Sequence, residues 1–99
     1  MLDINKETNG NKLVVALTGR LDTSTAPQLE EELKGATDNI TDLLFDMKGL
    51  EYISSAGLRV LLATQKAMNA KGSMKITGAN ENIMEIFEVT GFVDILSFE

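Results

Sequence analysis

The chain has 99 residues, 43% of them apolar, which suits one domain spanning residues 1–99 with a modest core. It contains no cysteine and no histidine, which excludes disulfides, thiolate metal sites and a triad with an imidazole base. The formal net charge of −6, without any basic cluster, disfavours a nucleic-acid partner. No apolar run approaches the ~20 residues that cross a bilayer, so we expect a cytoplasmic protein without membrane insertion.

The first third of the chain predicts a β-hairpin followed by a helix. Alternation from Leu2 and the turn at Asn9-Gly10 predict two antiparallel strands. The second strand, residues 12–18, is almost continuously apolar and should be central. Thr25 and Gln28 have the spacing of a capping box that starts the helix. The helix should bury one stripe, which consists of Ala26, Leu29, Leu33 and Ala36.

The remainder of the chain alternates strands and helices. Gly72 is expected to end the second helix, and Gly91 the third. The order predicts an α/β domain with a mixed sheet of four to five strands and right-handed crossovers. Three or four helices should pack mainly on one face. The expected elements are strands at 42–47, 74–77 and 95–98, and helices at 55–70 and from Asn80 to Gly91.

Two adjacent serines, Ser54 and Ser55, stand where the third strand gives way to the second helix. Free backbone N–H groups and the helix dipole favour a negative charge at such a position. A serine there can cap the helix, act as a nucleophile or carry a phosphate. A nucleophile would need a base, and the chain has no histidine to supply one. We therefore expect a protein that is not an enzyme and that uses neither a metal ion nor a cofactor.

Three segments together resemble the STAS family, named for sulphate transporters and anti-sigma factor antagonists. Residues 50–62, LEYISSAGLRVLL, resemble the family signature. Gly19-Arg20-Leu21-Asp22 is similar to its Gly-x-Leu-Asp motif, and residues 83–92 are similar to its closing helix and glycine. The resemblance covers essentially the whole chain, in order and at family spacing. It implies a STAS-like fold and the function of a stand-alone anti-sigma factor antagonist.

In such antagonists a serine kinase that is also the anti-sigma factor phosphorylates a serine at the start of the second helix. The unphosphorylated antagonist binds this kinase and frees the sigma factor, and a metal-dependent serine phosphatase resets the switch. Alignment through Gly57 places the acceptor on Ser55, with Ser54 as the alternative. Arg59 could pair with the phosphate. The residues expected at the partner interface are Asp22, Thr23, Ser54, Ala56, Gly57 and Arg59.

Several alternatives remain open at this point. Both serines could simply cap the helix, and Asp22 and Asp46 could be turn carboxylates instead of an acidic rim for the kinase. Tyr52 is expected in the core, together with Ile53. A STAS protein could also be a cytoplasmic accessory subunit of a membrane transporter. We expect a monomer or a weak dimer.

Overall fold

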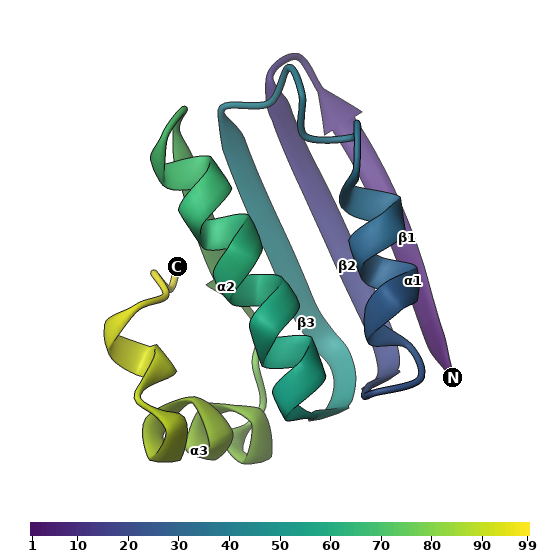
Figure 1. The fold of residues 1–99 in the computed structure, drawn as a ribbon, viewed down its shortest axis with the longest axis vertical. Coiled ribbons are helices and arrows are strands. Elements are labelled where there is room, and N and C mark those ends of the chain that lie inside the picture. Colours follow the sequence, from purple (N-terminus) through teal and green to yellow (C-terminus); the bar gives the residue numbers. More distant parts are fainter.

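Four strands form one mixed sheet in the order β1-β2-β3-β4 in a computed structural model that describes residues 1–99 (Figure 1). β1 pairs antiparallel with β2, while β2, β3 and β4 run parallel to one another. The strands are β1 (Leu2–Asn9), β2 (Lys12–Leu21), β3 (Asp42–Ile53) and β4 (Ser73–Thr77). The helices are α1 (Ala26–Leu33), α2 (Ser55–Asn69), α3 (Glu81–Thr90) and a short 3-10 helix, η1 (Phe92–Asp94). The predicted fold class is confirmed.

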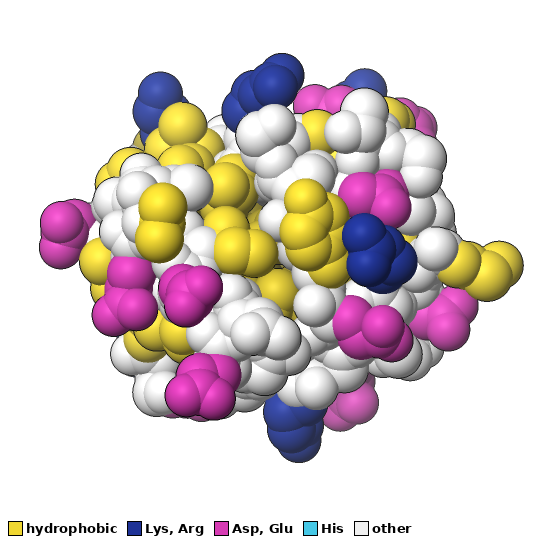
Figure 2. Space-filling model, turned by 90° about the horizontal axis from the view of Figure 1, so that it is seen from below, with side chains coloured by type: hydrophobic (Ala, Val, Ile, Leu, Met, Phe, Trp, Pro, Cys, Tyr) yellow, Lys and Arg dark blue, Asp and Glu magenta, His cyan; other side chains and the backbone are white.

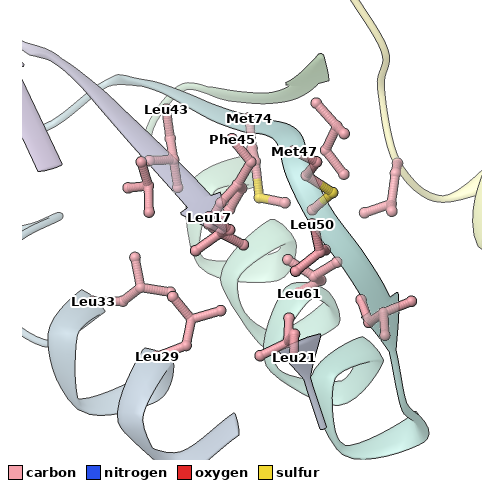
Figure 3. Close-up of a cluster of buried hydrophobic side chains, with 14 of the residues drawn as sticks. Leu17, Leu21, Leu29, Leu33, Leu43, Phe45, Met47, Leu50, Leu61 and Met74 are labelled. Carbon is pink, nitrogen blue, oxygen red and sulfur yellow. The ribbon is translucent and has the colours of Figure 1, made fainter. Parts of the chain in front are cut away.

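The core lies between the sheet and the two helices α1 and α2, which cover one of its faces (Figure 1). Alternate residues of β2 and β3 point into it, and α1 and α2 close it with Leu29, Leu33 and Leu61 (Figure 3). The strand residues at the centre of the core are Leu13, Val15, Leu17, Leu43, Phe45 and Met47. The intervening residues of these strands therefore point to the opposite face of the sheet.

α3 occupies the space next to the second half of β3. β4 pairs only with Asp42–Asp46, so the later part of β3 has no strand neighbour on that side. Asn80 fixes α3 there: its side-chain oxygen accepts a hydrogen bond from Ile83 N (2.9 Å), and its amide nitrogen donates to Leu50 O (3.0 Å). The predicted N-cap at Asn80 and C-cap at Gly91, with φ +81°, are both confirmed.

The predicted strand at residues 95–98 is wrong. Gly91 ends α3 and the chain turns at once into η1, after which only an isolated bridge joins Phe98 to Ile76. The Phe98 ring packs against Phe87, with 5.7 Å between ring centroids. Two backbone hydrogen bonds to Ile76, the buried side chain of Leu96 and the Phe98–Phe87 contact hold this segment, but it contributes no full strand.

Several boundaries also differ from the prediction, and β2 continues beyond the predicted residue 18 to Leu21. α1 ends at Leu33 because Lys34 is extended and Gly35 has φ +75°. The C-cap of α2 is Ala70, and Gly72 is required for another reason: a Cβ there would overlap Thr41 O and lie 2.6 Å from Thr41 C. β3 continues beyond Met47 to Ile53, through the polar pair Lys48-Gly49 that breaks its apolar run.

Candidate functional site

The ends of β2 and β3 bring the loop after β2 and the start of α2 together. Leu21 pairs with Ile53 at the last position of the parallel ladder, and Ser54 N donates to Leu21 O (2.9 Å). Two of the three segments singled out in the sequence thus meet at one end of the sheet, the lower end in Figure 1. Carboxyl ends of parallel strands are a common place for binding sites.

Ser54 and Ser55 have different roles in the structure. Ser54 is the N-cap of α2, with extended backbone, and its hydroxyl accepts a hydrogen bond from Gly57 N at 3.4 Å. Ser55 is the first residue of the helix, is exposed, and its hydroxyl makes no hydrogen bond within the chain. The cap and the free hydroxyl therefore belong to separate residues.

Gly57 lets the first turn of α2 lie directly on the ends of β2 and β3. It is buried, and a Cβ there would come within 2.7 Å of Leu21 Cγ and 3.0 Å of Ile53 Cγ1. The absence of a side chain at this position thus allows a close approach of α2 to the Leu21 and Ile53 side chains. Because it is buried, Gly57 positions the helix and offers no side chain to a partner.

Asp22 organises the loop after β2. Its carboxylate accepts hydrogen bonds from the Ser24 hydroxyl (2.7 Å), Ser24 N (3.0 Å) and Thr25 N (3.2 Å). The Ser24 hydroxyl bond is the largest cause that lowers the pKa of Asp22 below its ordinary 3.8, and the backbone bonds act in the same direction. The predicted local turn role of Asp22 is thus present, and the carboxylate is ionised at neutral pH.

The Thr25 side chain also holds this loop in place, whereas the sequence predicted it as part of a capping box with Gln28. No capping box forms, because Thr25 makes no side-chain cap bond and Gln28 instead donates to Leu2 O (3.1 Å). The buried Thr25 hydroxyl donates to Arg20 O and accepts from Asp22 N, each at 2.8 Å. No sequence pattern distinguishes this use of a threonine from a cap.

Arg20 and Tyr52 form a stacked pair that the sequence did not indicate. They are partners in the β2–β3 register, and the Arg20 guanidinium carbon lies 4.5 Å from the Tyr52 ring centroid. The predicted burial of Tyr52 is wrong, since 38% of it is exposed, whereas Ile53 is buried as expected. Asp46 lies in the middle of β3 and accepts a hydrogen bond from Lys48 N (3.0 Å), which is the turn-type role.

A groove between α1 and α2 opens beside Ser55. Its volume is about 380 Å³, and its lining joins three of the expected interface residues, Thr23, Ala56 and Arg59, to the start of α1. Arg59 is exposed and makes no ion pair within the chain, so its guanidinium is free to meet an anion. The other lining residues are Ala26, Pro27, Glu30 and Val60.

The end of the molecule that carries this site is apolar toward its middle and charged, with both signs, at its margins (Figure 2). Figure 2 shows apolar side chains gathered toward the middle of this end, with both acidic and basic side chains around them. No group of three or more acidic residues is arranged to hold a metal ion. No helix in the structure is both long and apolar enough to cross a bilayer.

Comparison with known proteins agrees with this arrangement. A model of the STAS domain family matches residues 3–99. The chain belongs to the STAS domain family. It is 30% identical over 96 residues to the "Anti-sigma-B factor antagonist" of Bacillus subtilis, covering 96% of this chain and 88% of that protein. It is 32% identical over 97 residues to the Staphylococcus aureus protein of the same name, covering 96% and 90%.

Solved structures show the same fold. An anti-sigma factor antagonist from Mycobacterium paratuberculosis superposes with a TM-score of 0.89 at 22% identity, over 99% of this STAS chain and 85% of that one. The Bacillus cell fate determinant SpoIIAA in its phosphorylated form superposes with a TM-score of 0.76 at 17% identity, over 98% and 91%.

Proposed function

We propose that this STAS protein is an anti-sigma factor antagonist that binds a serine kinase/anti-sigma factor, and that phosphorylation of Ser55 ends this binding. The observation that carries the proposal is the exposed hydroxyl of Ser55, free of hydrogen bonds, on the first residue of α2. Relatives of nearly equal length that are named anti-sigma factor antagonists support it. The protein is a regulatory binding module and has no catalytic role of its own.

A phosphate on Ser55 suits this protein and would disrupt a partner interface. A phosphoserine carries about −1.5 to −2 charges near neutral pH. Free N–H groups at the start of α2 and the unpaired Arg59 favour that charge. An unpaired dianion buried against a partner costs several kcal/mol, and each ~1.4 kcal/mol changes affinity tenfold. The fold therefore stays unchanged while binding is lost.

The proposed interface surrounds Ser55 at this end of the sheet. Thr23, Ala56 and Arg59 line the groove beside it, and Asp22 and Ser54 border it from the adjoining loop and cap. Gly57 acts by positioning α2. A metal-dependent serine phosphatase would return the protein to its binding form.

The test is phosphosite mass spectrometry on protein from its native cell, with Ser55→Ala and Ser54→Ala compared to wild type. The expected result is phosphate on Ser55, absent in Ser55→Ala and retained in Ser54→Ala. Copurification should recover a kinase with the unphosphorylated protein only. Phosphate on Ser54 would overturn the site assignment. A protein never phosphorylated in any growth condition and stably bound to a membrane transporter would instead support the transporter-subunit role.

A further inference from the structure

The face of the sheet opposite α1 and α2 carries no covering helix (Figure 1). Leu13 and Val15 point into the core, so Val14 between them points away from it, and the same alternation turns Leu44 outward. Both side chains, like that of Ala16, are only half-buried. The centre of this open face is therefore a small apolar strip on the two middle strands.

Charged residues flank this strip in a definite order. The register places Glu7 opposite Val14, Val14 opposite Leu44, and Leu44 opposite Lys75. Paired residues point to the same face. One row across the sheet therefore runs from an acid on β1, through two apolar residues, to a base on β4. In another row on the same face Lys12 of β2 is paired with Asp42 of β3.

These four charges have no ion-pair partner within the chain. The ion pairs that do form are Lys6–Glu32, Arg20–Asp22, Lys34–Glu31 and Lys48–Asp46. Glu7, Lys12, Asp42 and Lys75 take part in none of them. Their charges also sum to zero, whereas the whole chain carries −6. Asp46, which lies on the same face opposite Ala16, is paired with Lys48. A contact between two copies over these two rows therefore joins surfaces whose charges balance. It avoids the repulsion expected between two faces that share the negative net charge of the chain.

We propose that the open face binds a second copy of this chain, with a twofold axis parallel to the strands and midway between β2 and β3. That rotation lays β1 of one copy over β4 of the other, and β2 over β3. Glu7 then faces Lys75 of the second copy, and Lys12 faces its Asp42. Val14 of each copy meets Leu44 of the other. Every charge in the two rows meets its opposite.

The size of the contact indicates a weak dimer. Four strands about 4.8 Å apart, with roughly five residues of each in contact, give on the order of 400 Å² per copy. Specific interfaces of this size lie at the low end of the range, and their affinities are correspondingly weak. The sheet twist limits close contact to the central rows.

This arrangement is independent of the proposed phosphorylation. The contact lies on the face away from α2, so Ser55 stays accessible in both copies. Because the axis is parallel to the strands, both copies present the start of α2 at the same end of the dimer. A partner that is itself twofold could then engage two such ends at once, with a gain from effective concentration.

The test is sedimentation equilibrium of the unphosphorylated full chain at low salt, at protein concentrations from about 10 μM to about 1 mM. Lys75→Glu creates two repulsive pairs per dimer and is expected to weaken dimerisation at least tenfold. The charge swap Glu7→Lys/Lys75→Glu keeps the net charge and should restore the wild-type constant within about threefold. Lys66→Glu on α2 is the matched control: it changes the charge of the chain equally and should leave dimerisation nearly unchanged.

Three results would overturn the inference. Wild-type protein that stays monomeric at millimolar concentration has no such interface. Equal weakening by Lys75→Glu and Lys66→Glu would mean that overall charge, and no particular face, governs association. A charge swap that stays as weak as Lys75→Glu would refute the twofold arrangement. None of these results depends on Ser55, so the phosphorylation proposal can fail or stand separately.

Discussion

Replacing Thr25 with valine is expected to lower the free energy of unfolding by about 2 kcal/mol. Valine has nearly the same shape, so little packing is lost, but the Arg20 carbonyl and the Asp22 N–H each lose a partner at 2.8 Å. A hydrogen bond contributes about 1 kcal/mol net, and more where the remaining group stays out of water. For a domain of this size the melting temperature should fall by roughly 8–16 °C.

Urea unfolding followed by circular dichroism measures this change. Thr25→Ser keeps the hydroxyl and should lose less than about 1 kcal/mol, for the missing methyl group. Thr23→Val alters an exposed threonine without hydrogen bonds and should stay within about 0.5 kcal/mol of wild type. The reasoning is refuted if Thr25→Val unfolds at the same urea concentration as Thr23→Val. It is equally refuted if Thr25→Ser is as unstable as Thr25→Val.

Three further predictions concern stability. Because the pKa of Asp22 is lowered in the folded state, its ionised carboxylate contributes to stability above pH 3.8, and this contribution is lost as pH falls through the folded-state pKa. Asp22→Asn should therefore reduce the fall of the melting temperature at acid pH, and an unchanged fall would contradict this reasoning. Gly72→Ala forces a Cβ onto the Thr41 backbone and should cost about 2 kcal/mol in urea unfolding, with an unshifted midpoint as the contrary result. Ser54→Ala removes a long cap bond and should cost only about 0.5–1 kcal/mol; a loss above about 2 kcal/mol would show a larger structural role.

Local patterns predicted most of the fold. The turn after β1, the cap at Asn80 and the glycine after α3 are each set by a few neighbouring residues. The cap and the glycine are where the sequence placed them, whereas the turn is Gly10-Asn11, one residue beyond the predicted Asn9-Gly10. The strand expected at 95–98 failed because its apolar residues pack on α3 and make few backbone hydrogen bonds. Apolar content alone does not distinguish these two uses.

The site was predictable where it depends on chain order and unpredictable where it depends on register. The sequence places Ser54 and Ser55 at the start of α2 because the apolar residues change there from strand spacing to helical spacing. The stacking of Arg20 on Tyr52 follows from irregular register between β2 and β3, with shifts between Ala16 and Thr18 and between Gly19 and Arg20. Such shifts change which residues face each other, and nothing local in the sequence marks them.

The two outer edges of the sheet are protected in different ways. β4 is covered by the last residues of the chain, since Ile76 N donates to Ser97 O and Glu99 N donates to Ile76 O, each at 2.9 Å. β1 has no such cover but carries charged side chains at Asp3, Lys6 and Glu7. Both devices oppose the edge-to-edge strand pairing that leads to aggregation. Growth into an open-ended sheet is therefore disfavoured at either side, which leaves the faces of the molecule, and not the edges of its sheet, for contacts with other chains.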